Sequence, residues 1–211
     1  MVAHGYGASL AMPYLEPFLI ENLRDAGKLI QDKEVLKEAR GFMGQEAQHY
    51  QTHRRYNELL KASGYPELAE VEEAMQRSYD KLRKRTLTYR LAYTCGFETM
   101  TLGVTQWLVR DRTKLFGGSD TRVASFILWH FVQEAEHKRV AFDCYQDIAG
   151  NYLQRVLGLA TGSFHVLWWS RKGAVAMLKG DREFKGATPS IAPSIFVVRS
   201  VRLKLEQSYL G

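Results

Sequence analysis

One four-residue pattern, Glu-x-x-His, occurs twice in the chain, first as Glu46 with His49 and again as Glu134 with His137. Each copy lies in a long stretch whose apolar residues recur at three- and four-residue spacing, which is typical of a helix. Positions i and i+3 share one helix face, so each copy offers a carboxylate oxygen and an imidazole nitrogen to one point. Two such helices, with one Glu from each of two further helices, would form a dinuclear metal site in a helical bundle.

The spacing of apolar residues predicts a chain built from helices, and no segment shows a convincing strand period. We therefore expect an all-α fold. Pro13 and Pro17 fit the first helix if it starts near Pro13, because proline is tolerated in a first turn. The predicted helices span about residues 11–30, 32–60, 67–85 leading into 86–109, 120–149, 152–178 and 195–209.

The 211 residues suit a single domain, residues 1–211, with a core bundle at about 10–150 and a C-terminal helical extension at about 151–211. Residues 152–178 are apolar and dotted with glycine, which favours a packed or surface-lying helix over a membrane span. The first residues lack a signal-peptide pattern, and Cys95 and Cys144 read as buried thiols. We expect a cytoplasmic protein.

The net charge of +6 is concentrated in the last fifth of the chain, which is rich in Lys and Arg. A solvated basic surface is the main interpretation. Contact with an anionic membrane surface or an acidic partner is the alternative. No recognised DNA- or RNA-binding module is visible, so nucleic acid is not an expected partner.

The pattern places the candidate carboxylates inside apolar stripes. Phe42 and Met43 precede the first Glu-x-x-His, a run of apolar residues at 126–132 precedes the second, and Glu98 also lies in an apolar segment. A buried carboxylate without compensation costs several kcal/mol or neutralises itself. A metal ion is the simplest compensation for such a set, so Glu46, His49, Glu98, Glu134 and His137 are predicted ligands.

The fourth helix should supply one more Glu. The first predicted helix offers Glu16 and Glu21, and Glu16 is preferred because it lies among Tyr14, Leu15 and Phe18. Glu21 is the fallback.

Two further histidines share the faces of these helices. His130 lies four residues before Glu134 and is a candidate seventh ligand, whereas His53, four residues after His49, is a weaker one. Either histidine could instead be a hydrogen-bonded neighbour of the ligands. Thr101, one turn after Glu98, could line a reaction pocket, with helix packing as the alternative.

Several motifs of the chain are similar to those of the bacterial proteins known as predicted metal-dependent hydrolases, a ferritin-like family. The resemblance covers about residues 10–150 and implies a ferritin-like four-helix bundle with additional C-terminal helices, as well as a C-terminal tail that would make this chain truncated. The His130, Glu134 and His137 triplet also resembles that of di-iron N-oxygenases, which implies an extra histidine on one iron. Pro17 stands where the family usually has a basic residue. The matching motifs are Pro13 with Glu16, Gln45 to His49, His53 to Asn57, Phe97 with Glu98, Trp129 to Glu134, Glu136 to Lys138, and Ala141 to Asp143.

Oxygen and imidazole donors without a thiolate favour iron, with manganese as the alternative, so two such ions are the expected cofactors. We favour O2 activation on a small organic substrate, with an electron donor as a further partner and a homodimer as a candidate assembly. Aromatic residues such as Tyr93, Phe97, Trp107 and Trp129 suggest a lipophilic substrate. Hydrolysis by a metal-activated water is the alternative, and a non-catalytic iron-binding or structural bundle is the third hypothesis.

Overall fold

The computed structural model describes residues 5–136 and 139–180, and this part of the chain contains helices and no strand. The all-α prediction is therefore confirmed. The predicted last helix at 195–209 lies outside the described residues. The helices are α1 (Gly5–Ala26), α2 (Lys33–Ala62), α3 (Leu68–Arg83), α4 (Leu87–Arg110), α5 (Arg112–Phe116), α6 (Thr121–Glu134), α7 (Val140–Ile148) and α8 (Tyr152–Gly180).

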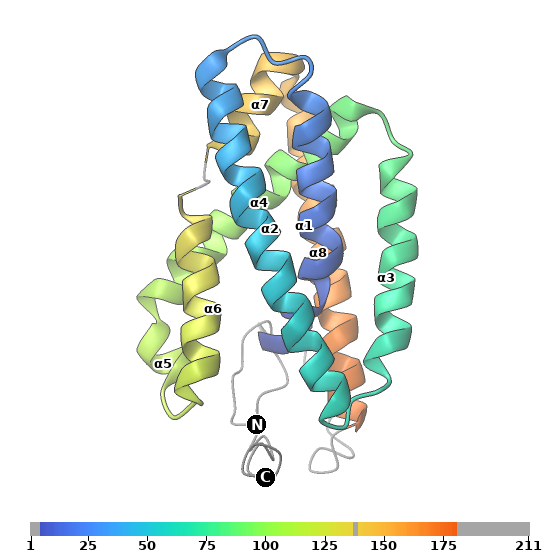
Figure 1. Ribbon diagram of the computed structural model, residues 1–211, viewed down its shortest axis with the longest axis vertical. Coiled ribbons are helices and arrows are strands. Elements are labelled where there is room, and N and C mark those ends of the chain that lie inside the picture. Colours follow the sequence, from blue (N-terminus) through green and yellow to red (C-terminus); the bar gives the residue numbers. More distant parts are fainter. Residues whose placement is uncertain (1–4, 137–138, 181–211) are drawn as a thin grey trace.

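The helix α1 lies at the centre of the bundle, where it packs against α2, α8, α3 and α4. It is apolar around most of its circumference, and Leu15, Phe18, Leu19 and Leu23 are fully buried. A helix that is apolar on all sides is expected in the interior. In Figure 1, α3 flanks this centre on the right, α5 and α6 lie on the left, and α7 lies at the top.

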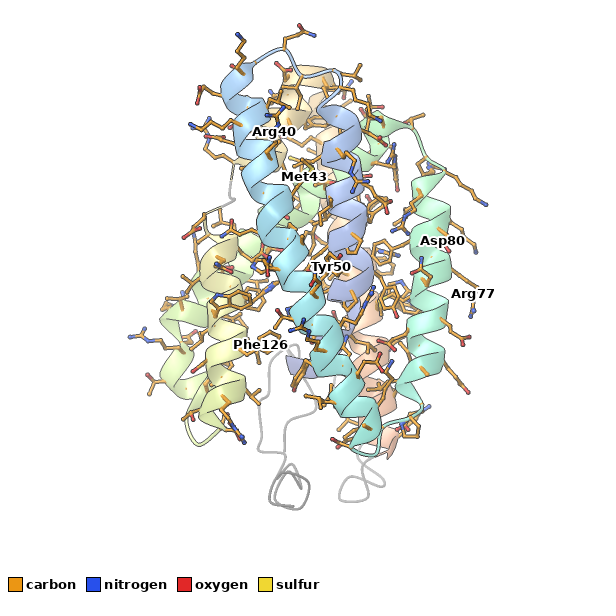
Figure 2. All side chains as sticks on the ribbon, in the orientation of Figure 1. Arg40, Met43, Tyr50, Arg77, Asp80 and Phe126 are labelled. Atoms are coloured by element: carbon orange, nitrogen blue, oxygen red, sulfur yellow. The ribbon has the colours of Figure 1, made fainter. Side chains whose placement is uncertain are left out.

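The helices α2, α3 and α4 begin and end close to the predicted residues. Asp32 is the N-cap of α2, and its side chain accepts hydrogen bonds from the backbone N–H groups of Glu34 and Val35. The helix α3 buries Met75 and Tyr79 on its inner face, while Arg77 and Asp80 project outward from it (Figure 2). Its alternation of charged and apolar residues is thus an amphipathic pattern.

The sequence predicts that the core bundle ends near residue 150, but the helix α8 lies beyond that residue and packs within the bundle. It packs along α4 and α1 and is a central part of the bundle, not an extension of it. A Cβ added to Gly96 of α4 would overlap the backbone of Gly158 in α8, and one added to Gly158 would overlap the backbone at Ala92. Glycine allows this close approach of the two helices, so the glycines of 152–178 mark a packed face.

Two other helix limits differ from the sequence-based prediction. The helix α1 begins at Gly5, so Pro13 and Pro17 lie in its interior and not in its first turn. Leu10 and Met12 are buried, which continues the apolar face toward the N-terminus. The predicted helix at 120–149 is divided into α6 and α7. No glycine or proline occurs at 135–139, so the sequence carries no signal for this break.

The length and the apolar character of the described helices can be compared with what a membrane crossing requires. None of them combines the length and the apolar character that a membrane crossing requires.

Candidate metal centre

Four helices bring six of the seven predicted ligands together in the interior of the bundle. The seventh, His137, lies outside the described residues. All six residues are at most 4 % exposed. They are Glu16 from α1, Glu46 and His49 from α2, Glu98 from α4, and His130 and Glu134 from α6.

The donor atoms of these residues form overlapping groups of three, and within each group they lie within 4.8 Å of one another. Two donors of one ion lie within about 4.4 Å, because bonds from nitrogen or oxygen to a metal are about 2.0–2.2 Å long. Small movements would thus let each group hold a cation. The groups are Glu46 with Glu98 and Glu134, Glu16 with Glu46 and His49, His49 with His130 and Glu134, and Glu16 with His53 and His130.

The His49 ring presents its Nδ1 atom to the carboxylates. Nδ1 lies 3.6 Å from Oε1 of Glu46 and 3.4 Å from Oε1 of Glu134. The other ring nitrogen, Nε2, lies 2.9 Å from Oε1 of Gln133, an amide oxygen that can only accept, so Nε2–H is the donor. Nδ1 is therefore the atom of His49 that would bind a metal held by the cluster.

The pKa values of this region reflect burial and crowding of charge. Burial lowers the pKa of His49, but the adjacent Glu134 and Glu46 outweigh it and raise the pKa to about 10. Burial raises the pKa of Glu16 well above its usual value, and the charges of Glu46, Glu134 and Glu98 raise it further. Glu98 has a raised pKa for the same reasons, burial first and then Glu134 and Glu46. Without cations, this site resists ionisation of Glu16 and Glu98.

Glu16 has the environment expected of a metal ligand. Both of its carboxylate oxygens are buried, and neither has a hydrogen-bond partner among the described residues. One oxygen each of Glu98 and Glu134 is in the same condition. Two divalent cations carry four positive charges, which would balance the four carboxylates with the imidazoles neutral. The residues present therefore fit a pair of metal ions.

The positions of Glu21 and His53 decide between the alternative ligands that the sequence leaves open. Glu21 lies away from the cluster and pairs with Arg83, whose Nε atom is 2.6 Å from its carboxylate. Glu16 is thus the acid of α1 that joins the others. His53 lies at the edge of the cluster, with Nε2 3.1 Å from Nδ1 of His130. Its pKa is held well below the usual value by burial and by His130 and His49. Gln133 was not predicted from the sequence, although its polarity after the apolar run at 126–132 is a signal.

A small cavity of about 40 Å³ adjoins the cluster at His130. Its walls are mainly apolar and come from α1, α4, α6 and α8. Thr101 and Phe97 line it, whereas Tyr93, Trp107 and Trp129 do not. The remaining lining residues are Ala8, Met12, Met100, Val104, Phe131, Val166, Leu167 and Ser170. The cavity is therefore an apolar space that borders one proposed ligand, His130.

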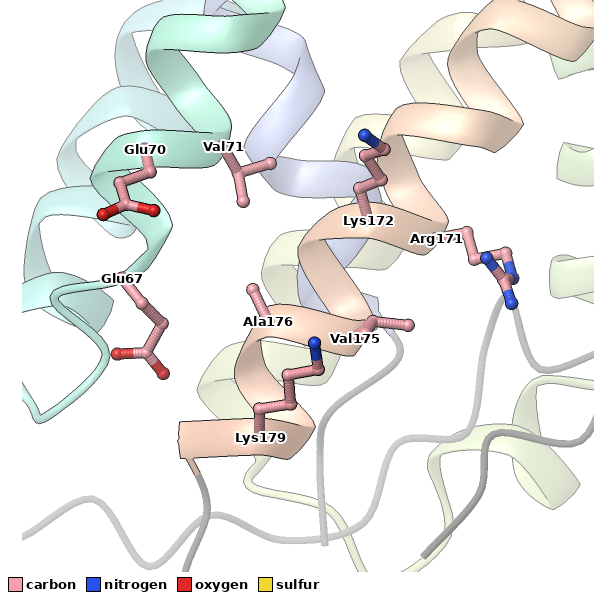
Figure 3. A pocket seen from close by; sticks show the side chains of 8 residues that line it. All are labelled: Glu67, Glu70, Val71, Arg171, Lys172, Val175, Ala176 and Lys179. Carbon is pink, nitrogen blue, oxygen red and sulfur yellow. The ribbon is translucent and has the colours of Figure 1, made fainter.

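A larger groove of about 700 Å³ lies between α3 and α8, far from this chemistry (Figure 3). Glu67 and Glu70 line its α3 side, and Arg171, Lys172 and Lys179 line its α8 side. It contains no residue of the metal cluster, so its size does not make it the active site.

The model of a family described as predicted metal-dependent hydrolase matches residues 4–208. No curated protein and no solved structure matches the chain. The resemblance to di-iron N-oxygenases therefore stays a prediction from the sequence.

Proposed function

Because the chain belongs to the family of predicted metal-dependent hydrolases, we propose that it hydrolyses a small, partly apolar ester with the help of two bound metal ions. The proposed ligands are the six clustered side chains and the seventh predicted ligand. They are Glu16, Glu46, His49, Glu98, His130, Glu134 and His137.

One observation carries this proposal. Four carboxylates, those of Glu16, Glu46, Glu98 and Glu134, are buried within reach of one another. No lysine or arginine in the described part of the chain forms an ion pair with Glu16, Glu98 or Glu134. Like charges in a dry interior are strongly unfavourable unless cations compensate them. A binding role for metal explains why the bundle keeps these acids inside.

The chemistry of hydrolysis follows from the ligands and the cavity. When bound, a pair of divalent cations lowers the pKa of a coordinated water and polarises the oxygen of an ester. The carboxylates would hold the ions, and Gln133 holds the His49 ring with Nδ1 turned inward. The cavity beside His130 has room for a short apolar group of the substrate, and the Thr101 hydroxyl, which lines it, offers a hydrogen bond to a polar part.

The donor set also bears on the choice of metal. Cys95 and Cys144 are buried and belong to none of the donor groups among the described residues. Carboxylate oxygens and imidazole nitrogens without thiolate suit iron and manganese. We propose iron first and manganese second.

The test uses the full chain loaded with Fe²⁺ or Mn²⁺ under nitrogen, with 4-nitrophenyl esters of increasing acyl length. We expect release of nitrophenol without O2, loss of activity on chelation, and loss of activity in Glu98→Gln. Glu21→Gln is the matched control, because it removes a carboxylate outside the cluster. A fully loaded protein that hydrolyses neither carboxylic nor phosphate esters would contradict the proposal.

Oxygen activation is the second candidate, and the donor set that suits iron is the observation in its favour. The sequence alone favoured it, but the family match supports hydrolysis instead. The two functions differ in their need for O2. Uptake of O2 by the Fe²⁺-loaded protein, with no anaerobic ester hydrolysis, would make oxygen activation the main hypothesis.

A further inference from the structure

A proline inside α1 leaves one backbone carbonyl available to another helix. In an α-helix the carbonyl of residue i accepts from the N–H of residue i+4, and proline has no N–H. Pro13 therefore cannot bond the carbonyl of Ser9. The side chain of Asn57, on α2, donates to this carbonyl instead, with 3.1 Å between Nδ2 and the oxygen. The interior proline thus gives α2 a fixed acceptor on α1.

This bond sets the orientation of the Asn57 amide. Its NH2 group faces the carbonyl of Ser9, so its Oδ1 atom is the acceptor that faces the hydroxyl of the same serine at 3.0 Å. A rotated amide would place two oxygens together at the carbonyl. Asn57 is fully buried, so water does not offer a substitute partner. The Ser9 hydroxyl therefore donates its one proton to Asn57.

The same hydroxyl also contacts His53. Ser9 Oγ lies 2.8 Å from Nδ1 of His53. Because its proton is already directed at Asn57, the hydroxyl can only accept here, so Nδ1 of His53 carries the hydrogen. In a neutral imidazole the other nitrogen, Nε2, then has the lone pair.

The last step reaches the metal cluster. Nε2 of His53 lies 3.1 Å from Nδ1 of His130, so His130 is the donor and holds its hydrogen on Nδ1. Nε2 of His130 then presents a lone pair on the side of Glu134, whose Oε1 lies 3.3 Å away. A ring nitrogen needs its lone pair to bind a metal. The opposite direction would leave two acceptors, Ser9 Oγ and Asn57 Oδ1, facing each other.

We propose that Asn57, Ser9 and His53 form a directional hydrogen-bond chain, anchored on the Ser9 carbonyl that Pro13 cannot bond, and that this chain fixes His130 with Nε2 as its metal-binding atom. These are positioning residues, since the chain acts through His130 and not on the substrate. The role in metal binding rests on the proposed function. The hydrogen-bond directions do not, because they follow from a backbone carbonyl and an amide.

Nitrogen NMR of protein labelled with ¹⁵N-histidine tests the directions. In the metal-free full chain, we expect His53 to carry its hydrogen on Nδ1. In the Zn²⁺-loaded chain, we expect His130 to carry its hydrogen on Nδ1 and to bind zinc through Nε2. A hydrogen on Nε2 of His53 in the metal-free protein would overturn the proposal whether or not the protein binds metal. Failure of the wild-type chain to bind Zn²⁺, Fe²⁺ and Mn²⁺ alike would instead count against the proposed function.

Zinc affinity, measured by competition with a chelating dye, tests the consequence. Ser9→Ala and Asn57→Leu should each weaken Zn²⁺ binding by about 10-fold, the lower end of the effect of losing a direct partner of a ligating histidine, because both act through His53. Thr105→Val is the control, because it removes a buried hydroxyl that lacks a hydrogen-bond partner among the described residues and lies outside the chain. It should leave the affinity unchanged. Equal affinities for Ser9→Ala and wild type would overturn the proposal.

A conservative exchange at His53 separates positioning from direct ligation. His53→Gln keeps an acceptor and a donor on one side chain and should bind Zn²⁺ within about threefold of wild type, whereas His53→Leu should lose about 10- to 100-fold. If both variants lose affinity equally, His53 acts as a ligand and the chain does not have the proposed role.

Discussion

The Nδ1 atom of His49 lies 3.4 Å from Oε1 of Glu134, although the two residues belong to different helices, α2 and α6. The contact joins the first Glu-x-x-His to the second. Because His49 also lies 3.6 Å from Glu46, one imidazole faces a carboxylate from each copy of the pattern. This arrangement is the core of the proposed metal site.

Glu16→Gln should change stability in opposite directions with and without metal. In the metal-free protein, it removes a buried carboxylate that the charges of Glu46, Glu134 and Glu98 disfavour, so unfolding should cost about 1–3 kcal/mol more at neutral pH. With metal, the variant loses a ligand and should be stabilised less than wild type. Urea denaturation with and without Mn²⁺ measures both effects. Glu21→Gln loses an ion pair with Arg83 and should cost up to about 1 kcal/mol in either state. A metal-free Glu16→Gln protein less stable than wild type would contradict the electrostatic account.

Gly158→Ala should destabilise the bundle because the new methyl group would overlap the α4 backbone at Ala92. Overpacking of this kind costs about 1–3 kcal/mol. The matched control is Gly103→Ala on α4, where a Cβ meets nothing within 4 Å. That change should stabilise the protein by about 0.5–1 kcal/mol through helix propensity. Equal unfolding free energies of the two variants in urea would show that α4 and α8 are not in close contact.

Val104→Trp should close the cavity beside His130, since Val104 lines it and is not a proposed ligand. We expect two metal ions per chain to be retained, with kcat/KM for a propionyl ester lowered by about tenfold or more and that for a formyl ester lowered less. Steady-state kinetics with a series of acyl lengths measures this. Equal effects on all lengths would remove the cavity as the acyl-binding site.

His165 should make the protein less stable in mild acid. Burial lowers its pKa from 6.5 to about 4 in the folded chain. As the pH falls below 6.5, the unfolded chain takes up a proton that the folded chain does not accept until about pH 4. Stability from this residue is thus complete above pH 6.5 and is lost as the pH falls toward 4. His165→Gln should show a weaker decline of unfolding free energy over this range, and parallel curves for the two proteins would refute the assignment.

The sequence predicts the fold class and most helix limits because the helical period is strong and caps such as Asp32 are explicit. It also prefers Glu16 over Glu21 because Glu16 lies among Tyr14, Leu15 and Phe18, and the structure places Glu16 beside Glu46 and His49. These signals are local, and each depends on a few residues of one helix.

Features that depend on contacts between helices were missed. The role of α8 was ambiguous because it is apolar on two faces: Val166 and Met177 are buried, whereas Leu153, Leu157 and Phe164 are exposed. The interior position of Pro13 likewise depends on another helix. Pro13 cannot donate to the carbonyl of Ser9, and Asn57 of α2 donates to that carbonyl instead. The break between α6 and α7 has no glycine or proline to announce it.

The most direct test of the central claim is the metal content of the full chain after loading with Fe²⁺ or Mn²⁺ and removal of free metal. The account predicts two ions per chain in the wild type and in Glu21→Gln, and fewer than two in Glu98→Gln, whose buried carboxylate shares a donor group with Glu46 and Glu134. A wild-type chain that holds no metal, or a Glu98→Gln chain that still holds two ions with wild-type affinity, would contradict it.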